Sequence, residues 1–155
     1  MPALKIGDKA PEFQGISDSG KTIKFSDYQG KILVLFFYPA ADSPGCTAQA
    51  CSFRDAYDDF LEMGAEVIGV SVDDQAAQDS FKSGRRLQYP LIADTSKEIS
   101  KAYGGVGILG KANRYTFLID RDGYIRNIWK LTGLFAQMKL GSHAEQVKKA
   151  IEELQ

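Results

Sequence analysis

The chain has few of the residues that build metal sites and structural disulfides. Its 155 residues include two cysteines and one histidine. A structural zinc site normally takes four Cys or His ligands, so this set is too small to form one. Two cysteines could make one structural disulfide, but a reducing compartment disfavours such bonds. The sequence therefore predicts no metal site, and it leaves a redox or nucleophilic cysteine pair as the alternative to a stable bridge.

Long apolar runs and blocks of like charge are also absent. The longest apolar run, Ile32–Tyr38, is far too short to cross a bilayer and is followed by Pro39. The formal net charge is -1 with both signs spread along the chain, so neither a membrane nor a nucleic-acid partner is expected. Met1–Asp8 lacks the apolar region of a secretory signal. We therefore expect a cytoplasmic protein, or a protein of the plastid stroma if a transit peptide has been removed.

Length and composition are those of one globular domain. Hydrophobic residues make up 44% of the chain and charged residues 25%, which is typical of folded domains. A chain of this length buries a sizeable core on its own. No repeat or linker divides it, so we expect one domain over residues 1–155.

Apolar runs predict the strands. Residues 31–38, 65–72 and 114–120 are rich in branched and aromatic residues, as in strands covered on both faces. The sequence Asp-Arg-Asp-Gly at 120–123 predicts a turn into a further strand at 124–129, which would form an antiparallel hairpin.

Helices are predicted in the intervals, and a second hairpin near the N-terminus. Apolar residues recur at helical spacing after the first long strand, on Cys46, Ala50, Phe53, Tyr57 and Phe60. The remaining predicted elements are helices at 75–86, 96–103 and 142–154, and a hairpin within 12–25. This order predicts an α/β fold of the thioredoxin-like type, in which helices cover both faces of a central mixed sheet.

The segment that joins the first long strand to its helix carries the chemistry. Open α/β sheets usually place their sites where a strand ends and a helix begins. Ser43 is a natural N-cap and Pro44 suits the first helical position, which places Cys46 in the first turn. Free N–H groups and the helix dipole favour a thiolate there, so such cysteines attack electrophiles at neutral pH. The alternative is that Cys46 simply fills the apolar stripe.

The second cysteine lies five residues further on. In a helix, Cys46 and Cys51 would have Cα atoms roughly 8–9 Å apart, whereas disulfides rarely form beyond about 7 Å. The two thiols can therefore bond only if the first turn unwinds. Such a bond is a poor structural staple and a plausible catalytic intermediate. The alternative is that Cys51 is an inert core residue.

These parts suggest a reaction with peroxides. A thiolate attacks a peroxide oxygen, and the resulting sulfenic acid condenses with a second thiol. The hydroxyl of Ser43 and the backbone N–H groups of Gly45 and Cys46 are candidate donors to the peroxide. A cation would favour the thiolate. Arg114 could supply it if the third strand neighbours the first, whereas its rival Arg54 lies two turns along the helix from Cys46.

The segment Tyr38–Cys46 resembles the peroxiredoxins. Their signature is a proline, three residues, a threonine or serine, two residues, and then the peroxide-attacking cysteine. Pro39, Ser43 and Cys46 fit that spacing. Serine is less common than threonine at position 43; it keeps the hydroxyl but lacks the methyl group that restricts the rotamer.

The likeness extends over nearly the whole chain. The cysteine at 51 and the following Phe-Arg-Asp at 53–55 resemble the Q-type branch, also called bacterioferritin comigratory protein. The opening segment 7–13 and the strand 114–120 resemble the family's entry segment and its arginine-bearing strand.

The resemblance implies a thioredoxin-dependent peroxidase for hydrogen peroxide and organic hydroperoxides. Cys46 would be the peroxidatic and Cys51 the resolving cysteine, and thioredoxin or a similar dithiol protein the reductant. Arg114 would position the thiolate and the peroxide, Ser43 would donate a hydrogen bond, and Pro39 would shield the pocket. No metal or organic cofactor is implied. Two cysteines within one helix need no second subunit, so a monomer suffices, and a weak dimer is compatible.

Two other functions compete with this one. A thioredoxin-like disulfide oxidoreductase would require Cys-x-x-Cys, and the four-residue gap argues against it. In sequence, only the set Pro39, Ser43 and Arg114 distinguishes a peroxidase from a thiol-based redox sensor. His143, in the opening turn of the last helix, is expected on the surface rather than as a catalytic base.

Overall fold

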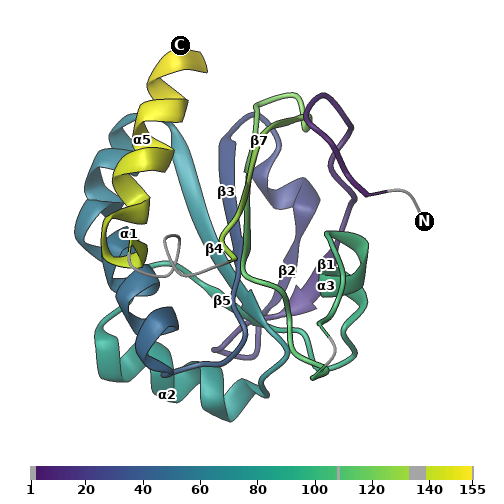
Figure 1. Ribbon diagram of the computed structural model, residues 1–155, viewed down its shortest axis with the longest axis vertical. Coiled ribbons are helices and arrows are strands. Elements are labelled where there is room, and N and C mark those ends of the chain that lie inside the picture. The colour runs from purple at the N-terminus through teal and green to yellow at the C-terminus, as the bar shows by residue number, and fades with distance from the viewer. Residues whose placement is uncertain (1–2, 108, 133–138, 155) are drawn as a thin grey trace.

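The computed structural model describes residues 3–107, 109–132 and 139–154. At its centre is a five-stranded sheet in the order β5-β4-β3-β6-β7 (Figure 1). Strands β3, β4 and β5 run parallel, whereas β6 pairs antiparallel with both β3 and β7, so the predicted mixed sheet is confirmed. The strands are β3 (Ile32–Phe37), β4 (Ala65–Ser71), β5 (Leu91–Ala93), β6 (Tyr115–Ile119) and β7 (Ile125–Lys130).

Strand β3 is buried along its entire length because it lies in the middle of the sheet. All six of its residues are buried. Val34 and Phe36 belong to the core on one face, and Leu33 and Leu35 to the core on the other. A strand covered on both faces needs no polar position, which explains the continuous apolar run in the sequence.

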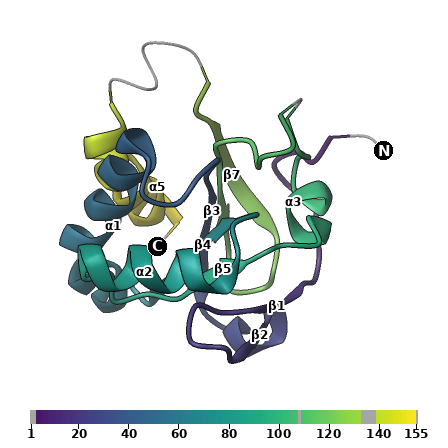
Figure 2. The ribbon, with the colours of Figure 1, turned by 90° about the horizontal axis from the view of Figure 1, so that it is seen from below.

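Helices cover both faces of the sheet, as the sequence predicts (Figure 2). Phe53, Phe81 and Val147, from three helices, fill the core on one face. On the other face Ile99 packs with Phe13 and with residues of the N-terminal hairpin. The helices are α1 (Pro44–Glu62), α2 (Gln75–Arg85), α3 (Glu98–Ala102) and α5 (His143–Leu154). The hairpin is β1 (Gln14–Ile16) and β2 (Thr22–Lys24), and two short 3-10 helices are Phe25–Tyr28 and Leu140–Ser142.

Two elements differ from the sequence-based expectation. Strand β5 is missing from the prediction because a run of three residues after Pro90 is too short to show a period. Helix α3 is only five residues long, shorter than the predicted 96–103. Within the described ranges no helix has the length and apolarity to span a membrane, and no cluster of His, Cys, Asp and Glu could hold a metal ion.

His143 corrects another prediction, since it lies in the core and not on the surface. Its side chain is 1% exposed. Nε2 lies 3.0 Å from the hydroxyl of Thr116 in β6, and Nδ1 lies 3.1 Å from Oε1 of Gln146. The ring packs edge-on between Phe53 of α1 and Trp129 of β7. The sequence could not show this, because nothing local indicates that the first turn of α5 lies against the sheet.

The environment of His143 disfavours its charged form. Burial lowers the pKa of this imidazole, the hydrogen bond with Gln146 raises it, and the nearby Arg114 lowers it again, with a net lowering. The unfolded chain therefore binds a proton at this residue more readily than the folded protein does. Stability contributed by neutral His143 is present above the ordinary histidine pKa of about 6.5 and is lost as the pH falls toward the folded value.

Replacing His143 with glutamine, which forms hydrogen bonds but does not titrate, isolates this effect. As the pH falls from about 7.5 to 5.5, histidines titrate and most carboxylates do not. We expect the free energy of unfolding to fall more steeply in the parent protein than in the variant, since the chain has no other histidine. Urea unfolding followed by circular dichroism at several pH values gives both slopes. Parallel slopes would contradict the prediction.

Candidate active site

The loop between β3 and α1 contacts Asp73, which follows β4, and Arg85 of α2. The backbone N–H of Ala41 donates to Oδ2 of Asp73 at 2.7 Å, and the hydroxyl of Ser71 donates to the same oxygen at 2.7 Å. Asp42 forms an ion pair with Arg85 of α2 at 2.9 Å. These contacts fix the direction in which the chain enters α1, and thereby the position of its first turn.

Cys46 is the third residue of α1 and is completely buried. It packs in the core with Phe36 and Tyr38 of the β3 segment and with Ala50 and Phe53 of its own helix. The predicted apolar stripe is therefore confirmed, and it includes Cys46. The thiol is free but is closed off from solvent in this conformation.

The start of α1 differs from the prediction in one respect. Pro44 occupies the first helical position and Ser43 the N-cap, as expected, but the Ser43 side chain makes no capping hydrogen bond. Its hydroxyl donates instead to the carbonyl of Ala40 at 2.8 Å. The backbone N–H groups of Gly45 and Cys46 thus have no side-chain cap and point their partial positive charge out of the helix end.

Arg114 reaches α1 because β6 lies beside β3. The residue immediately precedes β6 and is buried, at 8% exposed. Its Nη1 donates to Oε1 of Gln49 at 3.0 Å. Gln49 follows Cys46 by three residues and therefore lies on the same side of the helix, one turn along. The neighbouring strands thus bring the predicted cation to the helix that carries the predicted nucleophile.

Gln49 is the residue of this site that the sequence reasoning missed. It is completely buried. Because a guanidinium can only donate, the carbonyl oxygen of Gln49 must face Arg114, and its amide nitrogen faces away. That nitrogen and Nε of Arg114 are buried without a hydrogen-bond partner among the residues that the structure describes. The available signal was a polar residue three positions after Cys46, beside an otherwise apolar stripe.

The neutral amide of Gln49 has an electrostatic consequence. It orients Arg114 by accepting a hydrogen bond, yet it carries no negative charge to cancel that of the guanidinium. In a buried site the field of an uncompensated cation is weakly screened. Among the residues that the structure describes, no carboxylate forms an ion pair with Arg114.

Tyr38 lines the same region as a neutral group. Its hydroxyl donates to Oε1 of Gln78 at 2.5 Å, and Nε2 of Gln78 donates to the carbonyl of Ile92 at 2.8 Å. Burial raises the pKa of Tyr38 well above its ordinary range, against the opposing effect of hydrogen bonds, and the nearby Cys46 raises it further. A phenol held neutral in this way cannot act as a base at physiological pH.

Cys51 lies in the second turn of α1 and is half-buried. Arg54, the rival cation, is turned away from the first turn: Nη1 donates to the carbonyl of Arg85 at 2.9 Å and Nε to Asp55 at 2.9 Å. Both cysteines are free and lie within one continuous helix, so their Cα atoms are roughly 8–9 Å apart by helix geometry. Pro39, the remaining predicted site residue, is half-buried at the end of β3.

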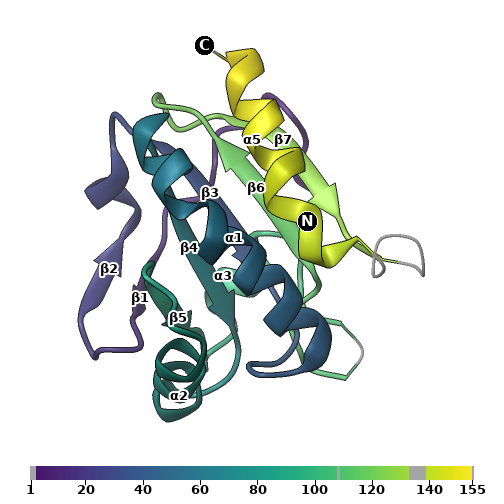
Figure 3. The same ribbon diagram turned by 90° about the vertical axis from the view of Figure 1, so that its left-hand side faces the viewer.

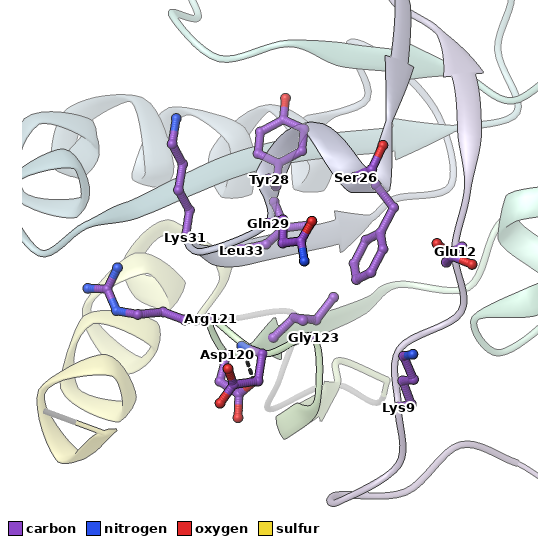
Figure 4. A pocket seen from close by; sticks show the side chains of 13 residues that line it. Lys9, Glu12, Ser26, Tyr28, Gln29, Lys31, Leu33, Asp120, Arg121 and Gly123 are labelled. Atoms are coloured by element: carbon purple, nitrogen blue, oxygen red, sulfur yellow. Dashed lines mark hydrogen bonds between the residues drawn. The ribbon is translucent and has the colours of Figure 1, made fainter.

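A cavity of about 240 Å³ opens at the other end of β3 (Figure 4). Leu33 and Ile119 form part of its floor, and Lys9, Glu12 and Lys31 lie at its rim. It adjoins the beginning of β3, whereas Cys46 follows the end of that strand. No cysteine lines it, so it is separate from the thiol site.

Comparison with known proteins shows one consistent likeness. The AhpC/TSA family matches residues 6–128 of the chain. Peroxiredoxin Bcp of Bacillus subtilis is 35% identical over 97% of this chain and 97% of its own length. The chloroplastic peroxiredoxin Q of Suaeda salsa is 36% identical over 96% of this chain and 68% of its own length.

Solved structures agree with these sequence relatives. The crystal structure of peroxidoxin BcpB from Mycobacterium tuberculosis superposes with a TM-score of 0.88 at 32% identity, covering 98% of this chain and 99% of that one. A cysteine-to-serine mutant of PrxQ from Xylella fastidiosa gives a TM-score of 0.86 at 26% identity, covering 99% and 98%.

Exchanging Gln49 for glutamate tests the electrostatic role of its neutral amide. A carboxylate would pair with Arg114 and cancel the charge beside Cys46. We expect the reaction of Cys46 with hydrogen peroxide at pH 7 to slow by about tenfold, the equivalent of about 1.4 kcal/mol, and its pH profile to move to higher pH. Stopped-flow kinetics in a Cys51→Ser background measure both.

Two further variants complete this test. Gln49→Met keeps the side-chain volume but removes the hydrogen-bond acceptor for Arg114. It should slow the oxidation of Cys46 but shift the pH profile less than Gln49→Glu does. Gln14→Glu adds the same charge on the exposed strand β1 and should leave the rate unchanged. An unaltered rate of Cys46 oxidation in Gln49→Glu would contradict the electrostatic role of the neutral Gln49 amide.

Proposed function

The chain belongs to the AhpC/TSA family and is a thiol peroxidase of the Bcp/PrxQ type, and we propose that Cys46 is its peroxidatic and Cys51 its resolving cysteine. The substrates are hydrogen peroxide and organic hydroperoxides. One observation carries the assignment: Cys46 occupies the uncapped first turn of α1, and Gln49 holds Arg114 against the next turn of the same helix.

In the first step the thiolate of Cys46 attacks one oxygen of the peroxide. The S–O bond forms as the O–O bond breaks, and the leaving oxygen takes a proton and departs as water or an alcohol. The sulfur is oxidised by two electrons to a sulfenic acid. The backbone N–H groups of Gly45 and Cys46, the Ser43 hydroxyl and Arg114 stabilise the negative charge that develops on the oxygens.

Access to the thiol requires a small opening movement. Cys46 is completely buried, and Pro39, which follows β3, is half-buried. In the resting conformation the Ser43 hydroxyl donates to Ala40, so it must rotate before it can donate to a peroxide. A site of this kind admits small peroxides and excludes bulk water, which strengthens the electrostatic contributions within it.

In the second step the sulfenic acid condenses with the thiol of Cys51. The S–S bond forms and water leaves. Because the helix separates the two cysteines by more than a disulfide spans, the first turn must unwind. That turn is weakly held: Ser43 does not cap it, and the hydroxyl of Thr47 is buried without a hydrogen-bond partner among the described residues.

A dithiol protein such as thioredoxin returns the enzyme to its reduced form. One of its thiolates attacks the disulfide to give a mixed disulfide, and its second thiol releases the reduced enzyme. The whole cycle fits within one chain, so a monomer suffices for activity. A cytoplasmic or, as in the chloroplastic relatives, a plastid location agrees with this chemistry.

Stopped-flow mixing of the reduced protein with stoichiometric hydrogen peroxide tests the two cysteine roles. We expect oxidation far faster than that of free cysteine. Thiol loss and Trp129 fluorescence monitor the reaction. Cys46→Ser should abolish it, whereas Cys51→Ser should stop at the sulfenic acid. Arg114→Met should slow it by on the order of 10²-fold, as the loss of one charge-stabilising donor does elsewhere. Oxidation no faster than that of free cysteine would sink the peroxidase assignment.

Steady-state turnover tests the reductant. With thioredoxin, its reductase and NADPH, we expect continuous peroxide consumption that requires both cysteines. Rapid oxidation of Cys46 without turnover would point instead to a redox sensor or to a different electron donor.

A further inference from the structure

The first turn of α5 lies against α1 next to Cys51 (Figure 3). Neither of the two proposed chemical steps involves this contact. We propose that this contact clamps the part of α1 that follows Cys51, so that only the turns before Cys51 unwind when the disulfide forms. His143 and Ser52 are then positioning residues for the resolving step. The inference rests on the proposed disulfide cycle.

The clamp holds two consecutive residues immediately after Cys51. The backbone N–H of Ala144 donates to the hydroxyl of Ser52 at 2.9 Å. The ring of His143 meets that of Phe53 edge-on, with centroids 5.5 Å apart. Because Phe53 is completely buried in the core, its displacement would expose a large aromatic side chain.

The clamp is itself anchored to the sheet. His143 shares a hydrogen bond of 3.0 Å with Thr116 in β6 and packs against Trp129 in β7. Both strands belong to the antiparallel half of the sheet, and neither of these contacts involves the first turn of α1. Unwinding of that turn would therefore leave the clamp in place.

Gln88 and Tyr89 also hold α1 near Cys51. The hydroxyl of Tyr89 donates to the carbonyl of Ala50 at 2.8 Å, and the side chain of Gln88 donates to the carbonyl of Arg54 at 3.1 Å. Cys51 is thus bracketed by tethered residues both before and after it. It stays in place while its partner moves.

The turns before Cys51 have no comparable support. Pro44 contributes no N–H group, and Gly45 lowers the local helix propensity. For residues 44–49, the bond from Arg114 to Gln49 is the one side-chain hydrogen bond that the described residues supply from outside the helix. This difference along α1 directs unwinding to residues 44–49.

A fixed Cys51 has a kinetic advantage. When only Cys46 must search for its partner, the effective concentration of the second thiol stays high. If the helix frayed through Cys51, both sulfurs would be mobile and closure would slow. A longer-lived sulfenic acid is then exposed to a second peroxide and over-oxidised.

Two mild variants test the clamp by separating the chemical steps. Ser52→Ala removes the acceptor for Ala144, and Thr116→Val removes the partner of His143. We expect the second-order oxidation of Cys46 to stay within about twofold, and disulfide closure to slow by roughly three- to tenfold, as one lost hydrogen bond allows. Stopped-flow Trp129 fluorescence gives both rates, and mass spectrometry of acid-quenched samples identifies the species.

The matched control is Ser83→Ala on the exposed side of α2, which should change neither rate. Closure that is unchanged or faster in both test variants, with normal oxidation of Cys46, would overturn the proposal. More sulfinic acid at high peroxide in Ser52→Ala than in the control would support it.

Hydrogen exchange tests the clamp without relying on catalytic turnover. In the reduced protein we expect the amides of residues 45–49 to exchange faster than those of residues 50–56. Ser52→Ala should raise the exchange rate of the second group and leave the first unchanged. Equal protection of both groups in the parent protein would refute the clamp independently of any activity.

Discussion

The packing of α1 across β3 is the interaction on which the rest of the structure depends. Strand β3 is buried on both faces, and the buried side of α1 continues its core with Cys46, Ala50 and Phe53. The proposed nucleophile is thus part of the hydrophobic core rather than an addition to its surface. A reaction that moves the sulfur must therefore disrupt core contacts, and the proposed clamp would confine that disruption to the end of one helix.

Neutral groups surround Arg114, the cation of the proposed site. Gln49 orients the guanidinium without pairing with it as an ion, and burial keeps His143 uncharged nearby. Tyr38 is likewise held in its neutral form. Each of these residues forms at least one hydrogen bond, although the amide nitrogen of Gln49 has no partner among the described residues.

Most of the fold could be predicted from the sequence, because the central strands are continuous apolar runs and α1 has a clear helical stripe. The placement of Cys46 at a strand-to-helix junction followed from the same patterns. The buried polar contacts could not be predicted: Gln49, His143 and the hydroxyl of Ser43 each depend on which element packs beside them. Such partners are set by tertiary packing, whereas periodicity reports only which side of an element is buried.

Arg114 and Gln49 are 65 positions apart in the chain, and their contact exists only when β6 has docked beside β3. A nascent chain that has emerged only as far as α3 already carries both cysteines but lacks the guanidinium. On the proposed mechanism its thiols are no more vulnerable to peroxide than ordinary cysteines. On that mechanism, rapid reaction with peroxide is acquired late, as a property of the completed sheet.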